Sequence, residues 1–275
     1  MIVMKFGGTC VGSGREIANI ARVTARILKQ TGTPPVVVVS AMNGVTDSLR
    51  RAASTAASGD RRTYQLIRDQ LEQRHGQAIG DCVTDPEHAR ALRAEIETLL
   101  NWLENLCQSI WTLGELTPRG LDAVLGLGER LSARLAAAAM LDQGSKAQTV
   151  EATEVIVTDG HFGNAAPLME ETTAKARARL LPLLEAGVVP VVTGFIGATT
   201  DGVATTLGRG SSDYSATIIG HCLSADEVWV WSDVDGVMTA DPHIVPDART
   251  LPTISYAEVA ELSYFGAKVL HPKTI

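Results

Sequence analysis

The first 60 residues repeat one pattern: an apolar run, a loop of small residues, and then a helical periodicity. Residues 1–6 form a short apolar run, and residues 36–39 are four consecutive valines. Each run is followed by a glycine-containing loop and by apolar residues spaced three or four positions apart, the spacing of a helix with one buried face. Strands that alternate with helices favour a parallel sheet covered by helices. The pattern therefore predicts an α/β fold with three layers, α/β/α, around a mainly parallel central sheet.

Residues 61–113 depart from this pattern because they are rich in Arg, Glu, Gln and Leu and carry almost no strand signal. Their periodicity predicts two or three helices, which we interpret as a helical insertion. The same criteria predict, in chain order, a helix over 129–141 that stops near Gly144, strands over 149–157 and 188–196 with a helix over 172–185 between them, a hairpin strand over 203–207, a helix over 215–223, a strand over 227–231 and a helix over 255–262.

Composition and charge narrow the class of protein. A chain of 275 residues can bury a full core, and its 31 acidic and 24 basic residues include no lysine or arginine block that would favour a nucleic-acid partner. The four cysteines form no Cys-x-x-Cys pair, which favours reduced thiols. There is no signal-peptide core, and no apolar run approaches the roughly 20 residues of a membrane helix. We therefore expect a cytoplasmic protein with no membrane and no nucleic-acid partner.

A glycine pair follows the first apolar run. Gly7 and Gly8 let backbone amides approach a phosphate closely, and Lys5 can place one positive charge against its oxygens. The segment lacks the Lys-Ser or Lys-Thr that ends a Walker motif. A Gly-Gly turn also has a purely structural explanation, so these residues alone leave phosphate binding open.

A second anion-binding candidate covers residues 206–213 and leads directly into a helical pattern. Small residues before a helix start form a backbone nest, where the first amides lack partners within the helix. Arg209 can grip a carboxylate or phosphate there with two parallel hydrogen bonds. The alternative is an ordinary capped helix with Ser212 or Asp213 at the N-cap. Capping explains Asp213 well but does not explain the glycines on either side of Arg209.

Three further features carry weaker signals. An acidic turn after the strand at 227–231 contains Ser232, Asp233 and Asp235, and suits ribose, base or magnesium contacts as well as a plain turn. Lys268, which follows Gly266 and Ala267, can reach a cleft or simply favour a helix C-terminus. Glu129 at a helix start is likewise explained by the helix dipole alone.

Taken together, these segments resemble the aspartate kinases within the amino-acid kinase superfamily, whose carbamate kinase-like fold is the one expected here. The matching segments occur in the family's order along essentially the whole chain: residues 5–9, 40–46, 128–129, 162–164, 193–197, 206–213, 233–236 and 265–272. The resemblance implies ATP-dependent phosphorylation of the side-chain carboxylate of L-aspartate to 4-phospho-L-aspartate, the first step of lysine, threonine and methionine biosynthesis.

The resemblance also implies roles for individual residues. The expected catalytic residues are Lys5 and Asp213. The expected substrate-binding residues are Thr46, Glu129, Arg209 and Ser212, and the expected nucleotide-binding residues are Lys5, Gly7, Gly8, Ser232, Asp233, Met238 and Lys268. Magnesium is expected to enter with ATP, held by phosphates and water rather than by protein ligands. Because the acceptor carboxylate is already an anion at neutral pH, such a site needs positioning and charge neutralisation more than a general base.

The resemblance further implies two lobes. Residues 1–200, with the insertion at 61–113, are expected to bind substrate, and residues 201–275 to bind nucleotide. The family usually continues with a further helix and strand and with regulatory ACT domains, so we expect an incomplete second lobe and no inhibition by lysine or threonine. A homodimer is a family expectation. Two alternatives stay open: a relative acting on glutamate, acetylglutamate, carbamate or a phosphomonoester, and an inactive nucleotide-binding fragment.

Overall fold

The computed structural model describes residues 1–234, 236–240, 244–245, 247–264 and 272–274. Its centre is a five-stranded sheet in the order β3-β5-β2-β1-β8, in which every neighbouring pair is parallel. The strands are β1 (Ile2–Phe6), β2 (Val36–Val39), β3 (Ala147–Val150), β5 (Val189–Thr193) and β8 (Glu227–Trp231). The predicted strands at 1–6, 36–39 and 227–231 are thereby confirmed.

Burial explains why these runs are continuous rather than alternating. Every residue of β2 and β5 is buried, as expected for inner strands of a parallel sheet that is covered on both faces. In β8, by contrast, no residue is fully buried, because it lies at the edge of the sheet beside β1. The core therefore sits around β2 and β5.

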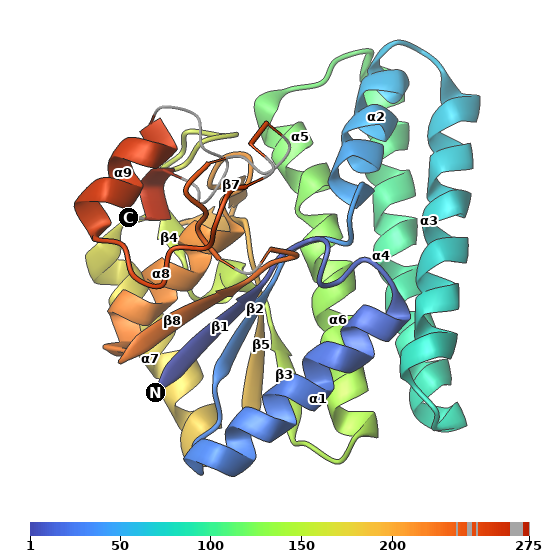
Figure 1. Cartoon of the computed structure of the whole chain (residues 1–275). Coiled ribbons are helices and arrows are strands. Elements are labelled where there is room, and N and C mark those ends of the chain that lie inside the picture. The colour runs from blue at the N-terminus through green and yellow to red at the C-terminus, as the bar shows by residue number, and fades with distance from the viewer. Residues whose placement is uncertain (235, 241–243, 246, 265–271, 275) are drawn as a thin grey trace.

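Helices cover both faces of the sheet, which confirms the three-layer α/β/α prediction (Figure 1). On one face lies α6 (Leu127–Asp142), with α1 (Gly14–Thr31) packed along it. The other face is covered by α7 (Met169–Glu185) and α8 (Ser212–Leu223). The helix α8 begins three residues earlier than predicted, so Ser212 and Asp213 lie in its first turn.

A layer of further helices packs outside α1 and α6, on the right of Figure 1. It contains α2 (Val45–Ala57), α3 (Arg61–Cys82), α4 (Pro86–Leu113) and α5 (Pro118–Leu125). The prediction of two or three helices over 61–113 is confirmed by α3 and α4, which begin at the side-chain caps Asp60 and Asp85. The sequence interpretation missed α5, although Thr117 caps it and Pro118 occupies its first turn, which is a recognisable start signal.

Two predicted strands are each divided between two sheets. The strand predicted at 149–157 consists of the end of β3, a 3₁₀ turn at Ala152–Glu154 and the start of a second strand, β4 (Val157–Thr158). The run at 188–196 divides at Gly194 and Phe195, where Phe195 has a φ of 68° and the Ile196 amide donates to the Gly194 carbonyl at 2.7 Å. This tight turn starts β6 (Ile196–Thr199), which pairs with β4 and, antiparallel, with β7 (Ala204–Thr206). The predicted hairpin is confirmed.

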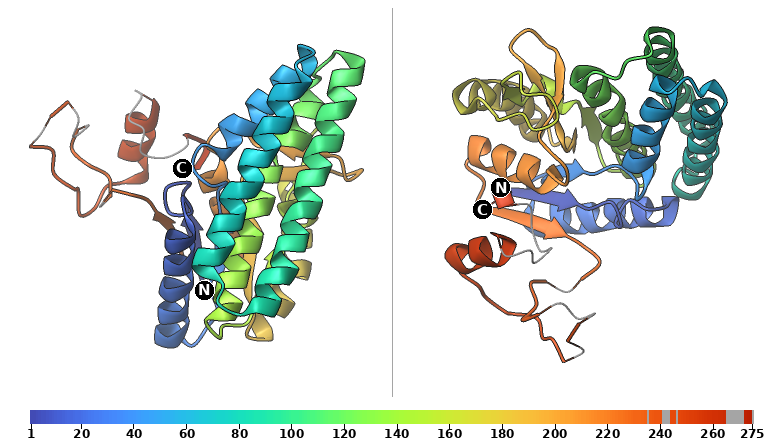
Figure 2. Two further views of the ribbon diagram at one scale, coloured as in Figure 1. Left: turned by 90° about the vertical axis from the view of Figure 1, so that its right-hand side faces the viewer. Right: turned by 90° about the horizontal axis from the view of Figure 1, so that it is seen from above.

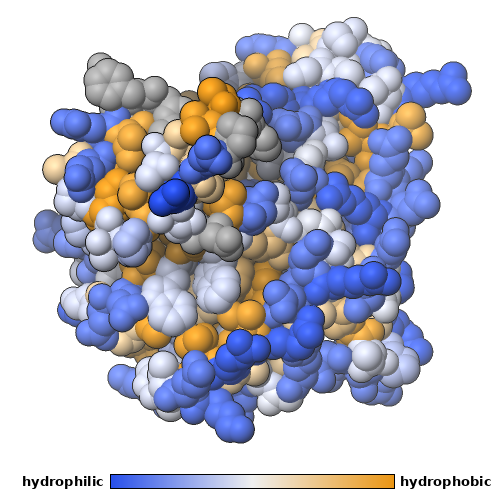
Figure 3. All heavy atoms as spheres, in the orientation of Figure 1, coloured by the Kyte–Doolittle hydropathy of each residue, from blue (hydrophilic) through white to orange (hydrophobic). Residues whose placement is uncertain are grey.

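Much of the chain that follows β8 projects from the body of the molecule (Figure 2), but its last described turn packs against α8. Its described elements are α9 (Tyr256–Tyr264) and a 3₁₀ turn at Pro272–Thr274. Several of the large apolar side chains that the molecule exposes belong to this stretch: Val234, Ile244, Val245 and Tyr256. Hydrophilic side chains predominate over α1 and the outer helices, and apolar surface is more frequent over the half that carries β8 and α9 (Figure 3).

Within the described residues, no helix is both long enough and apolar enough to span a membrane.

Candidate functional site

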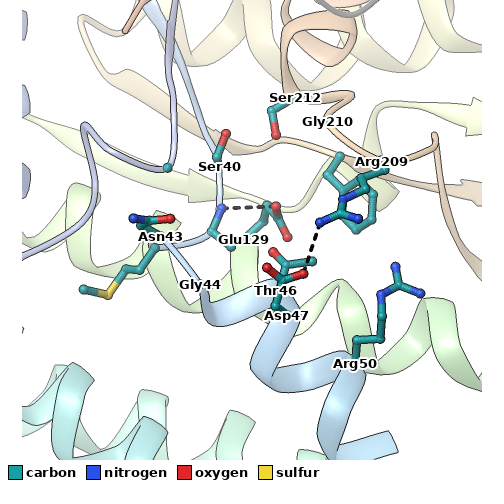
Figure 4. A pocket seen from close by; sticks show the side chains of 14 residues that line it. Ser40, Asn43, Gly44, Thr46, Asp47, Arg50, Glu129, Arg209, Gly210 and Ser212 are labelled. Carbon is teal, nitrogen blue, oxygen red and sulfur yellow. Dashed lines mark hydrogen bonds and ion pairs between the residues drawn. The ribbon is translucent and has the colours of Figure 1, made fainter. Parts of the chain in front are cut away.

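A pocket of about 250 Å³ lies at the carboxyl ends of β1, β2 and β5, between α2, α6 and α8 (Figure 4). Loops at this edge of a parallel sheet are the usual place for a ligand. The pocket brings together four residues expected from the sequence to hold substrate, together with Gly8. Its lining consists of Gly8, Ser40, Ala41, Met42, Asn43, Gly44, Thr46, Asp47, Arg50, Glu129, Phe195, Arg209, Gly210 and Ser212.

Glu129 supplies a buried carboxylate to this pocket from the first turn of α6. It is only 3% exposed. Its Oε1 accepts a hydrogen bond from the Ala41 amide at 3.1 Å, and its Oε2 has no hydrogen-bond partner in the part of the chain that the structure describes. Burial disfavours the charged form and raises the pKa of Glu129 to about 8. A buried carboxylate with one open oxygen is suited to receive a cationic group of a ligand.

The loop between β2 and α2, which contains Ala41, is held tightly against α6. Ser132 donates from its hydroxyl to the Ser40 carbonyl at 2.6 Å. A Cβ atom on Gly128 would lie 2.7 Å from the Ala41 side chain, closer than real Cβ contacts allow, so glycine is required where the helix meets the loop. These contacts set the position of the loop that leads into Thr46.

A buried ion pair lies beside the pocket, because Asp213 directly follows the lining residue Ser212. Lys5, near the end of β1, and Asp213, in the first turn of α8, join through Nζ and Oδ1 at 2.6 Å, and their side chains are 11% and 12% exposed. A Cβ atom on Gly7 would lie 3.3 Å from Lys5 Nζ. The two residues predicted to be catalytic are therefore in direct contact, and the glycine keeps the space beside the ammonium group clear.

Arg209 reaches the pocket from the loop between β7 and α8. Its neighbours Gly208 and Gly210 have φ values of 104° and 77°, which glycine adopts without strain. The guanidinium contacts Asp47 at 3.4 Å, and the two side chains are 84% and 69% exposed. Figure 4 shows this pair at the rim of the pocket, with Arg50 nearby on the same helix as Asp47. The rim thus offers cationic groups to an anion, opposite the carboxylate of Glu129.

Asp122 on α5 holds the Arg209 loop in place although it is absent from the pocket lining. Its carboxylate accepts hydrogen bonds from the amide and the hydroxyl of Thr206 and from the Gly163 amide, all at 2.8 Å. Burial raises the pKa of Asp122, and these hydrogen bonds oppose the rise. Because Thr206 ends β7, Asp122 anchors the strand from which the Arg209 loop departs.

Five of the residues predicted to bind nucleotide lie at the same edge of the sheet, in or beside β1: Lys5, Gly7, Gly8, Ser232 and Asp233. The Gly7 amide donates to the Trp231 carbonyl at 3.2 Å, so Ser232 and Asp233 follow β8 next to the glycine pair. Ser232 donates to the Asp233 carboxylate at 3.0 Å. Met238 lies farther along, where it bridges to Thr250, and does not line the pocket.

Two of the candidate positions, Lys268 and Asp235, lie outside the described residues. Within the described ranges, no three His, Cys, Asp or Glu side chains gather as a metal-binding group.

The sequence interpretation missed five contributors to the site: Ser40, Asp47, Arg50, Phe195 and Asp122. Arg50 lies one helical turn after Thr46, so helical spacing could have indicated it. Asp122 lies in the helix that was not predicted, and its capping signal could have indicated that helix but not the burial of its carboxylate. For Phe195 no sequence signal marks the positive φ that turns it toward the pocket.

The chain is similar over nearly its whole length to known aspartokinases. Aspartokinase 1, chloroplastic, of Arabidopsis thaliana is 37% identical over 99% of this chain and 47% of its own length. The bifunctional aspartokinase/homoserine dehydrogenase 1, chloroplastic, of Zea mays is 35% identical over 99% of this chain and 29% of its own length. The chain therefore spans half or less of these two relatives.

A solved structure of E. coli aspartokinase III in complex with aspartate and ADP superimposes with a TM-score of 0.89 at 32% identity, covering 100% of this chain and 58% of that one. The resemblance to aspartate kinases is thereby confirmed. The family model that matches is described as the amino acid kinase family, and it matches residues 1–275. The chain belongs to the amino acid kinase family.

Proposed function

We propose that this chain transfers the γ-phosphoryl group of ATP to the side-chain carboxylate of L-aspartate and forms 4-phospho-L-aspartate. The observation that carries the proposal is the buried Glu129 carboxylate, which lines the same pocket as Arg209 and whose Oε2 has no hydrogen-bond partner among the described residues. A free α-amino acid carries one ammonium and one carboxylate on the same carbon, and this pair of protein charges is complementary to both. Acceptors without a free α-amino group would leave Glu129 buried without a cation.

In this proposal Glu129 binds the α-ammonium group, and Arg209 binds the α-carboxylate. Thr46 and Ser212 fix the substrate by hydrogen bonds from either side of the pocket. The pocket volume of about 250 Å³ suits a small amino acid. Support also comes from the relatives, because the similar aspartokinase III was solved with aspartate and ADP.

Lys5 and Asp213 carry the transfer in this proposal. The side-chain carboxylate of aspartate is already ionised at neutral pH, so attack on the γ-phosphorus needs no base. The obstacle is the approach of two anions, and the Lys5 ammonium offsets it by neutralising charge on the phosphoryl oxygens in flight. Asp213 holds that ammonium at 2.6 Å and so orients it.

ATP is proposed to bind at Lys5, Gly7, Gly8, Ser232 and Asp233, and also at Met238 and Lys268, of which Lys268 lies outside the described residues. Magnesium would enter bound to the phosphates and to water. The division into lobes at 1–200 and 201–275, a homodimer and a cytoplasmic location stay predictions.

A hydroxamate-trapping assay tests the proposal. The purified chain is incubated with ATP, magnesium, hydroxylamine and, separately, L-aspartate, L-glutamate, N-acetyl-L-glutamate and L-aspartate that is blocked at the α-amino group. Hydroxamate is expected with L-aspartate and not with the blocked form, because the latter offers Glu129 no ammonium. Signal with glutamate or acetylglutamate but not aspartate would assign a different acceptor. No signal with any acceptor, although the chain binds ATP, would contradict the proposal.

A further inference from the structure

One arginine outside the pocket connects the two loops that build the site. Arg74, on α3, donates from Nη1 to the Asn43 carbonyl at 2.7 Å and from Nη2 to the Gly12 carbonyl at 3.1 Å. Gly12 belongs to the loop between β1 and α1, and Asn43 belongs to the loop between β2 and α2. A single guanidinium therefore spans two segments that are about 30 residues apart in the sequence.

Each of these loops carries a different half of the proposed chemistry. The first contains Gly7 and Gly8, beside the Lys5 ammonium. The second contains Ala41, whose amide binds Glu129, and it leads into Thr46. Apart from Arg74, the loops are joined by a hydrogen bond from the Asn43 amide to the Gly8 carbonyl at 3.2 Å. Their relative position decides how the phosphoryl donor faces the acceptor.

The helix that carries Arg74 is itself tightly fixed. It packs against both α1 and α2, the helices that the two loops enter. A Cβ atom on Gly14, the first residue of α1, would lie 2.4 Å from the Ala78 carbonyl of α3. The start of α1 therefore rests directly on α3, one turn beyond Arg74. This packing places the helices, and Arg74 places the loops that precede them.

We propose that Arg74 is a positioning residue that sets the distance between the β1–α1 loop, which contains Gly7 and Gly8, and the pocket that contains Glu129 and Thr46. This inference rests on the proposed function. Arg74 is not among the residues that line the pocket, so it acts through the two backbone carbonyls. Group transfer depends steeply on the alignment of the reacting atoms, and a displacement of about 1 Å can cost a hundredfold in rate. Loss of the link should therefore lower kcat more than it raises either KM.

Three variants test this inference: Arg74→Met, Arg74→Lys and, as a matched control, Arg62→Met. Arg62 is an exposed arginine on the same helix, away from both loops. Arg74→Met is expected to lower kcat by at least about tenfold, with KM for ATP and for aspartate each within about threefold. The kcat of Arg74→Lys should lie between those of wild type and Arg74→Met, because an ammonium is a point charge without the planar fork that reaches both carbonyls. Arg62→Met should have the kcat and KM values of wild type.

Hydrogen exchange gives a second readout that does not need turnover. In Arg74→Met, the amides of residues 8–12 and 41–45 should exchange faster than in wild type and in Arg62→Met, while the amides of β2 and β5 keep their protection. Faster exchange in only one loop, or in neither, would overturn the inference. Unchanged kcat, or a rise in one KM alone, would also overturn it. If wild type fails to phosphorylate aspartate, the proposed function is wrong, and the exchange data still decide whether Arg74 links the loops.

Discussion

Two pairs of opposite charge lie at the two ends of the site, and they differ in almost every physical respect. Lys5 and Asp213 meet at 2.6 Å with side chains 11% and 12% exposed. Arg209 and Asp47 meet at 3.4 Å with side chains 84% and 69% exposed. The first pair joins a central strand to the first turn of a helix. The second joins a surface loop to an exposed position on α2.

The difference teaches which end of the site is preorganised. Separating a buried pair would leave an unpaired charge in a region of low dielectric, which is costly. Each partner therefore holds the other strongly in place. An exposed pair contributes little, and water screens it. The Lys5–Asp213 pair is therefore in place before any ligand arrives. At the rim, the Arg209 guanidinium can leave Asp47 for a ligand carboxylate at little cost.

The largest effect is expected from Lys5→Met. Without the ammonium group the charge on the transferring phosphoryl group is no longer neutralised, and kcat should fall by about a thousandfold. The buried Asp213 carboxylate would also lose its partner, which should lower the free energy of unfolding by about 3 kcal/mol. Steady-state kinetics and denaturant unfolding measure the two effects.

The double variant Lys5→Met with Asp213→Asn separates these effects. Removing both charges should restore part of the stability, because no buried charge is left unpaired, but it should restore none of the activity. Recovery of turnover in the double variant would mean that Lys5 has only a structural role.

The second effect concerns Glu129→Gln. The amide keeps the shape of the side chain and can still accept from Ala41, but it offers no charge to an ammonium group. KM for aspartate should rise by about a hundredfold, the size expected for the loss of a charge-assisted hydrogen bond at a buried site. KM for ATP should change little. A change in both KM values would indicate a general disturbance of the site rather than loss of an ammonium clamp.

The pH dependence of Glu129 gives a third and smaller effect. Its pKa is raised by burial from 4.5 to about 8, so the protonated form is favoured in the empty protein. Protonation of Glu129 in the folded state therefore contributes stability that is fully present below pH 4.5 and is lost progressively as the pH rises from 4.5 through about 8. An ammonium ligand needs the ionised form. Between pH 6 and 7, the Kd for aspartate should therefore fall by about tenfold, with release of one proton.

Calorimetry in two buffers of different ionisation enthalpy measures both the Kd and the proton release. The Glu129→Gln variant should show a flat profile over the same range. A pH-independent Kd in the wild-type protein would contradict a neutral Glu129 in the empty pocket.

The smallest effect is expected from Asp47→Asn at the rim. Stability should change by less than about 1 kcal/mol, because exposed ion pairs contribute little. Arg209 would no longer be shared with Asp47, so the Kd for aspartate should fall by about two- to threefold at low salt. At high salt the two proteins should converge, since screening weakens the competing pair. A large change in kcat would show instead that Asp47 takes part in the transfer.

Local patterns in the sequence were sufficient to predict the layered fold. The four valines of β2 and the residues of β5 are buried on both faces of the sheet. A strand of this kind can be predicted from its mainly apolar sequence. The helices α3 and α4 follow from periodicity and from their aspartate caps. The two divided strands were each predicted as one, although Glu151 and Glu154 interrupt the apolar residues between β3 and β4, and Gly194 interrupts those between β5 and β6. Only the partner strands decide which sheet each piece joins.

The residues of the site divide in the same manner. Lys5, Gly7, Gly8 and Arg209 were predicted because they belong to contiguous motifs next to strands or helix starts, where local chemistry is visible in the sequence, whereas the catalytic role of Asp213 came from the family resemblance. What the tertiary structure alone decided is which side chains are buried and which backbone groups they meet. The high pKa of Glu129, the three hydrogen bonds of Asp122 and the link that Arg74 makes between two loops all arise from contacts between residues far apart in the chain. Burial and such contacts depend on the packing of whole elements, which no local pattern records.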